Sequence, residues 1–88
     1  MMKVKEIRGL MEDETGRRPF ILRISKPQKS PGGDYFCVID LPAIAAVGDG
    51  LKIFGIDAKQ AAKLSLDFIR KVLSTKRLLH DNGRPMKI

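Results

Sequence analysis

Residues 57–80 read DAKQAAKLSLDFIRKVLSTKRLLH, and this stretch decides the fold. Asp57 followed three residues later by Gln60 is an acidic variant of the capping box, in which a carboxylate accepts free backbone N–H groups at a helix start. No Gly or Pro interrupts the stretch, and Asp-Asn-Gly at 81–83 supplies a stop signal. The sequence therefore predicts one helix over about 58–80, about 33 Å long at about 1.5 Å per residue.

The apolar residues of this helix fall into two adjoining rows that together cover roughly 200° of its circumference at about 100° per residue. This is about twice the stripe that a helix packed on one surface needs. One row contains Ala61, Leu64, Phe68, Val72 and Leu79, and the other contains Ala58, Ala62, Leu66, Ile69 and Leu73. A sheet can bury one row, so the second row needs a cover. We predict that four residues of the second row bind a partner: Ala62, Leu66, Ile69 and Leu73.

Three covers for the second row are open. The C-terminal residues 84–88 can fold back, the apolar loop at 42–47 can lie across the helix, or an identical chain can pack there as an isologous dimer. Small domains often compensate for a thin core by oligomerising. The first functional hypothesis is therefore a non-enzymatic protein-interaction module that self-associates through the helix, as a homodimer or with another protein.

Four segments before the helix predict strands, at about 3–10, 19–27, 34–41 and 51–56. The clearest is YFCVIDL at 35–41, which is apolar on both sides and so indicates a central strand. We predict a single α+β domain over 1–88: a four-stranded antiparallel meander in the order 1-2-3-4, then one long C-terminal helix and a flexible tail at 83–88. The expected core contains Phe20, Leu22, Ile24, Cys37, Ile39, Ile53, Leu64, Phe68 and Val72.

Composition narrows the class of protein. The 88 residues include 17 Lys+Arg and 10 Asp+Glu, which gives a formal net charge of +7. No uncharged apolar run approaches the length of about 18 residues that a membrane span needs. The first nine residues, MMKVKEIRG, carry charges where a signal peptide would be apolar, so we expect a cytoplasmic protein with no membrane contact.

The sequence contains no arrangement typical of a catalytic or metal site. Cys37 is the only cysteine and His80 the only histidine, which excludes an internal disulfide, a multi-cysteine zinc site and a multi-histidine metal site within one chain. The carboxylates are explained by turns, a cap and helical ion pairs, and the Gly-containing segments match no phosphate-binding pattern. We expect no enzyme activity, no cofactor, no metal and no small-molecule ligand.

The positive charge supports a second hypothesis. Several cations lie on or near the predicted strands, where they could neutralise phosphates, and exposed aromatic rings would strengthen the case because bases stack on them. A charged surface is also often just a solvated one. The alternative function is binding of single-stranded DNA or RNA on the basic sheet surface, through Arg17, Arg18, Arg23, Lys26, Lys52 and Tyr35.

Two short patterns resemble a small bacterial family of unknown function. Cys37-x-Ile39-x-Leu41 matches a C-x-[VI]-x-[IL] strand, and the run from Gly55 through Asp57 to Gln60-Ala61 matches a G-[VI]-D-x-x-Q-A helix start. The family pattern continues with a leucine where this chain has Ala62. The resemblance implies a small α+β fold and transfers no functional residue. In its order of elements alone, the chain is also similar to single-stranded-DNA-binding transcriptional coactivators.

Overall fold

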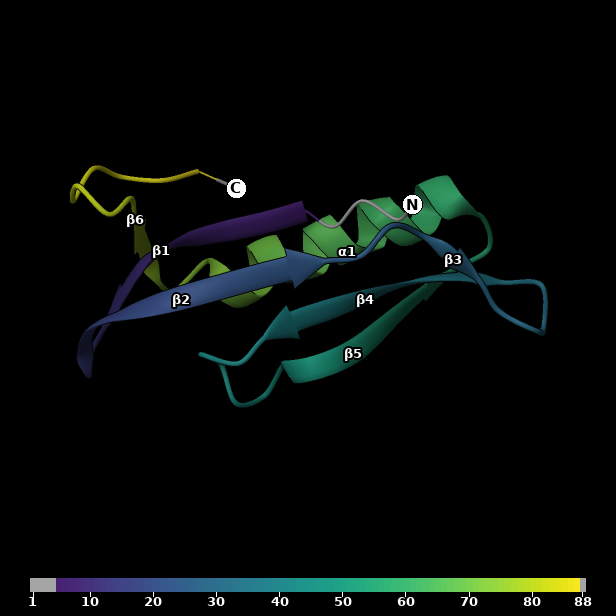
Figure 1. Ribbon diagram of the computed structural model, residues 1–88, viewed down its shortest axis with the longest axis horizontal. Helices are drawn as coiled ribbons and strands as arrows, with labels where there is room; N and C mark the ends of the chain where they lie inside the picture. Colours follow the sequence, from purple (N-terminus) through teal and green to yellow (C-terminus); the bar gives the residue numbers. More distant parts are fainter. Residues whose placement is uncertain (1–4, 88) are drawn as a thin grey trace.

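The computed structural model describes residues 5–87, which form one antiparallel sheet and one helix (Figure 1). The elements, in chain order, are β1 (Lys5–Asp13), β2 (Gly16–Ile24), β3 (Gln28–Lys29), β4 (Tyr35–Leu41), β5 (Gly48–Gly55), α1 (Ala58–Leu73) and β6 (Arg77–Leu79). Residues 3 and 4 of the first predicted strand, and residue 88 of the predicted tail, lie outside the described residues.

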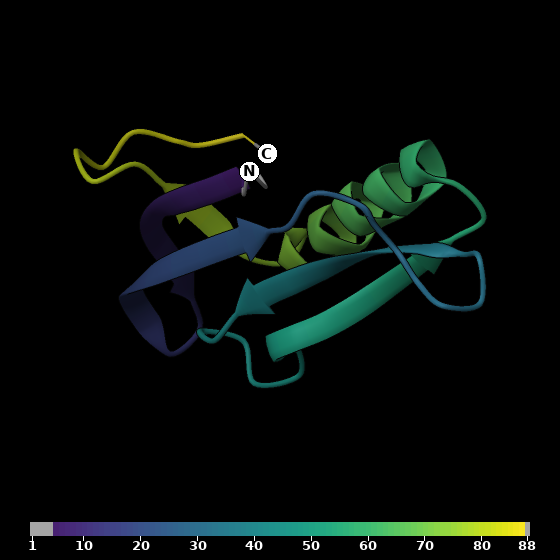
Figure 2. The same ribbon diagram turned by 45° about the vertical axis from the view of Figure 1, so that its right-hand side comes forward.

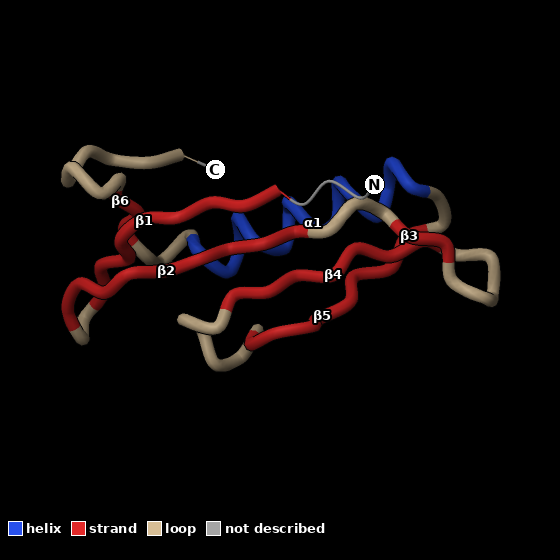
Figure 3. The backbone as a smooth tube through the Cα atoms, in the orientation of Figure 1, coloured by secondary structure: helices blue, strands red, loops and turns tan. Residues whose placement is uncertain are grey.

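The sheet confirms the predicted α+β meander. β1 pairs with β2, β2 with β4, and β4 with β5, all antiparallel, so the four main strands lie side by side in chain order. The short strand β3 continues the path of β2 along β4, and β6 pairs with the other side of β1. α1 lies along one face of this sheet and packs on β4 and β5 (Figures 2 and 3).

The helix begins where the capping pattern predicts. The Asp57 carboxylate accepts the backbone N–H of Gln60 at 2.7 Å, and the Gln60 side-chain oxygen accepts the backbone N–H of Ile56 at 2.7 Å. Both bonds satisfy N–H groups that have no partner within the first helical turn. A purely local signal therefore fixed this boundary.

The predicted C-terminal end of the helix is wrong. α1 ends at Leu73, where the Ser74 hydroxyl donates to the Lys71 carbonyl at 2.7 Å, and the chain then turns into β6. β6 pairs with β1, which buries Leu79 to 3% exposure. Pairing with a distant strand overrides the apolar periodicity that continues past Leu73.

The C-terminal segment folds back on the sheet edge and does not cover the helix. A turn at 80–84 reverses the chain, Pro85 forms a bridge with Leu79, and the Met86 N–H donates to the Leu78 carbonyl at 2.8 Å. Met86 is half-buried against the core. The edge of the sheet formed by β6 is therefore closed by the chain itself.

The hairpin between β1 and β2 is tighter than predicted. Residues 11–18, which separate the first two predicted strands, belong mostly to β1 and β2. Only Glu14 and Thr15 lie between the paired residues Asp13 and Gly16. Gly16 has a φ of 118°, which favours glycine. The first two strands are each nine residues long as a result.

Most of the predicted core is confirmed on the strands. The five core residues predicted on β2 and β4 are all buried, and Met11 and Leu41 join them. On the helix, however, the buried positions are Ala61, Ser65, Ile69 and Leu73. Leu64, predicted in the core, is 40% exposed, whereas Ile53, Phe68 and Val72 are half-buried.

The helix is rotated relative to the prediction, and this has a consequence for the second apolar row. The buried residues of α1, from Ala61 through Ser65 to Leu73, follow the boundary between the two rows and face the sheet. The buried hydroxyl of Ser65 donates to the Ala61 carbonyl at 2.8 Å. Ile69 and Leu73 are covered by the chain's own sheet, so the expectation of an uncovered second row is wrong for these two residues. Ala62 and Leu66 remain half-buried.

Candidate nucleic-acid interface

The face of the sheet turned away from α1, called the outer face below, is formed by alternate residues of each strand. Cys37 and Ile39 of β4 are buried toward the helix, so Phe36 and Val38 point to the outer face. Their direct partners in β5 are Phe54 and Lys52. β1 and β2 contribute the pairs Glu6–Arg23, Arg8–Ile21 and Glu12–Arg17 to the same face.

Phe36 and Phe54 form an aromatic pair across β4 and β5. Their ring centroids are 5.6 Å apart and their planes are tilted by 43°. The Lys52 ammonium lies 5.0 Å from the centroid of the Phe36 ring, within the range of a cation–π contact. Phe54 is 52% exposed, which is unusual for a large aromatic side chain. The outer face therefore presents an accessible ring with a cation beside it.

Three carboxylates of β1 each contact two cations. Each cluster keeps one surplus positive charge. The clusters are Glu6 with Arg8 and Arg23, Glu12 with Arg17 and Arg77, and Asp13 with Arg18 and Lys76. The Glu6 and Glu12 clusters lie on the outer face.

The Glu6 cluster is the tightest of the three. The Nε atoms of Arg8 and Arg23 each lie 2.8 Å from one oxygen of the Glu6 carboxylate. These hydrogen bonds, led by that of Arg8, lower the pKa of Glu6, and Glu6 in turn raises the pKa of Arg8. Because a guanidinium has five N–H donors, both arginines keep donors directed to solvent.

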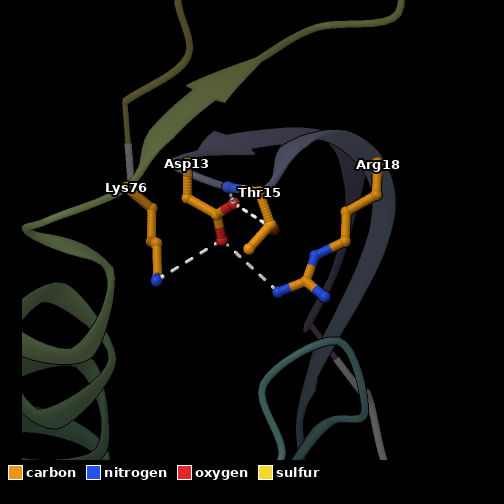
Figure 4. Close-up of polar contacts among 4 residues, drawn as sticks. All are labelled: Asp13, Thr15, Arg18 and Lys76. Carbon is orange, nitrogen blue, oxygen red and sulfur yellow. Dashed lines mark hydrogen bonds and ion pairs between the residues drawn. The ribbon is translucent and has the colours of Figure 1, made fainter.

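The Asp13 cluster connects the hairpin to the end of the helix (Figure 4). Asp13 accepts the Thr15 N–H at 2.9 Å and its hydroxyl at 2.6 Å, and these bonds are the main cause of its lowered pKa. Lys76, which follows α1, lies 3.5 Å from the same carboxylate, and Arg18 lies 3.4 Å from it. The Asp13 side chain is only 9% exposed, so this cluster is structural.

The structure separates the residues predicted for nucleic-acid binding. Arg17, Arg23 and Lys52 lie on the outer face, whereas Arg18 belongs to the Asp13 cluster. Tyr35 pairs with Gly55 on the helix side and is half-buried. Lys26 is exposed near the end of β2, also on the helix side.

Phe36 and Phe54 are the aromatic residues that sequence reasoning left out of the site. Phe36 is identified by its strand position, because it precedes buried Cys37 and so points to the opposite face of β4. Phe54 is identified as the direct partner of Phe36 in β5. Both positions become informative only when the helix-facing side of β4 is known.

The remaining residues predicted for partner binding line a groove. Ala62 and Leu66 of α1 face Ile24 and Cys37 across an apolar groove of about 400 Å³, with Lys5 and Lys26 at its rim. Cys37 is 1% exposed, so its thiol packs as a small apolar side chain.

The described part of the chain contains no group of three or more His, Cys, Asp or Glu side chains placed to hold a metal ion. Within residues 5–87, no helix has the length and apolar character to cross a membrane. The chain matches no protein-family model, no curated protein and no solved structure. The resemblance of the Cys37 and Asp57 patterns to a family of unknown function thus stays a prediction.

Proposed function

We propose that this protein binds single-stranded nucleic acid on the outer face of its sheet and has no catalytic activity. The observation that carries the proposal is the cross-strand pair of Phe36 and Phe54, with Lys52 beside it and one ring half exposed. Aromatic rings on an open sheet are stacking platforms for unpaired bases, and a nearby cation neutralises the phosphate that follows.

Each group has a role in this proposal. A base stacks on the exposed ring of Phe54, and Lys52 moves from the Phe36 ring to a backbone phosphate, which frees the second ring for a second base. Arg8 and Arg23 lie on β1 and β2 of the same face, and their free N–H donors bind further phosphates. The strand of nucleic acid then runs across the sheet, from β5 toward β1.

Single strands are favoured over duplexes because the bases of a duplex are stacked on one another and present no ring face to Phe54. The self-association hypothesis for the helix receives less support, since Ile69 and Leu73 are already buried within one chain. The outer face is therefore the better candidate for the functional surface.

Fluorescence anisotropy with labelled single-stranded and duplex oligonucleotides tests the proposal. Replacing Phe54 with Ala should weaken single-strand binding by about 5- to 150-fold, because stacking contributes about 1–3 kcal/mol per base. The matched control is Lys59→Ala, which removes a cation from exposed helix surface and should change affinity little.

A salt titration supplies the second readout. If Lys52, Arg8 and Arg23 contact phosphates, log K should fall with log[salt] with a slope of about −2, and Lys52→Gln should make the slope shallower. Absence of binding at low salt would refute the proposal, as would equal losses for Phe54→Ala and Lys59→Ala.

A further inference from the structure

The two edges of the sheet differ. At one edge, β6 pairs with Leu10–Glu12 of β1, and the returning segment at 85–86 pairs with β6. At the other edge, β5 pairs only with β4, and along Leu51–Phe54 no other described residue pairs with its backbone. A free edge of this length exposes a row of N–H and C=O groups that can pair with another strand.

Apolar side chains gather at this same edge. The exposed large apolar residues of the described chain are Phe54 in β5, Ile56 just after it, and Leu64 on α1, with 52%, 74% and 40% exposure. Leu64 lies about half a turn around the helix from Ala62 and Leu66, which face the β2 side, so it points toward the β5 side. Apolar residues therefore border the free edge on both faces of the sheet.

The charged residue that would guard this edge is turned away from it. Lysine on an edge strand commonly discourages pairing with a second chain. Here the Lys52 ammonium is held over the Phe36 ring of β4, inward from the edge. The free edge is therefore open to a second strand.

We propose that a second copy of this chain occupies the edge, with β5 pairing antiparallel to β5 of the partner about a two-fold axis. In a two-fold symmetric contact both chains use the same residues, so the exposed apolar residues at the edge lie next to their equivalents in the partner. The two sheets join into one, and the outer faces of the two copies become continuous, with both Phe54 rings near the two-fold axis.

The position of the helix agrees with this arrangement. α1 packs over β4 and β5, and strands lie about 4.8 Å apart, so the two helices would run about 10 Å from each other. This is about the distance at which helices pack. Leu64 lies on the flank of each helix that faces the partner. The flank that carries Ala62 and Leu66 stays outside this contact.

Sedimentation velocity across a concentration series tests the proposal. We expect the wild-type chain to be a dimer at micromolar concentrations, and Leu64→Glu to weaken dimerisation at least 10-fold, because it places two carboxylates at the two-fold contact. The control is Lys59→Glu, an exposed helix position on the opposite flank, which should leave the dimer intact. Circular dichroism of both variants checks that the helix content is unchanged.

Amide hydrogen exchange on the wild-type protein gives a readout that needs no variant. Outward-facing amides within Leu51–Phe54 should exchange more slowly as protein concentration rises, whereas amides at the covered β1–β6 edge should not change. A chain that stays monomeric at micromolar concentrations overturns the proposal. A dimer with concentration-independent exchange in β5, or one that Leu64→Glu leaves unaltered, overturns it as well.

Discussion

The rotation of α1 predicts unequal losses of stability when two apolar residues of similar size are replaced by Ala. Ile69 is fully buried, and replacing it with Ala removes side-chain carbons from a packed site and leaves a cavity, which costs about 3 kcal/mol within the usual range of about 2–5 kcal/mol. Leu64 is 40% exposed, so Leu64→Ala loses only part of its transfer free energy, and we expect a cost of about 1 kcal/mol.

Urea unfolding monitored by circular dichroism measures both free energies of unfolding. In a domain of this size, the Ile69→Ala cost corresponds to a fall in Tm of about 12–24 °C, several times the fall for Leu64→Ala. The measurement is made at the lowest usable protein concentration, so that association contributes little. If Leu64→Ala destabilises the protein as much as Ile69→Ala, the helix faces the sheet as its sequence predicts, and the rotation described above is refuted.

Two further predictions concern backbone approach and pH. A Cβ atom at Gly55 would lie 2.5 Å from the backbone N of Ala61. Gly55→Ala should therefore push the start of the helix away from β5 and lower the free energy of unfolding in urea by about 1–3 kcal/mol. Gly50→Ala is the control, because Gly50 has open space around it and only its positive φ opposes the substitution. The lowered pKa of Asp13 means that its contribution to stability is present above the pKa of the unfolded chain and is lost as pH falls through the folded value. The fall in stability from pH 7 to pH 3 should therefore be smaller in Asp13→Asn than in the wild type, and an identical pH profile would contradict this role.

Sequence reasoning succeeded where the determining contacts are local. The start of α1 depends on two hydrogen bonds within five residues, Gln60 N–H to Asp57 and Ile56 N–H to Gln60, and the pattern of residue types identifies both. The order of the four main strands likewise follows from short connections between neighbouring strands. These features were predictable because no distant part of the chain decides them.

The helix end and the helix rotation were not predictable, because distant residues decide them. Arg77–Leu79 carry a helical apolar pattern, but pairing with β1 draws them into the sheet. Ser65 is a polar residue at the centre of the buried line, and its hydroxyl is satisfied within the helix by the Ala61 carbonyl. A count of apolar positions cannot detect a buried polar residue that bonds to its own backbone.

The chemistry of the candidate site and two of its cations, Arg23 and Lys52, were predicted from the sequence, but its aromatic pair was not. The net charge of +7 indicated cations, yet six of them are shared among the three carboxylates of β1, so the net surplus of these clusters is only three charges. Total charge is therefore weak support for a nucleic-acid interface in this protein. The stronger support is the exposed ring of Phe54 in a strand that also carries Lys52, paired with Phe36. Leaving an apolar ring in water has a cost that stacking on a base would recover.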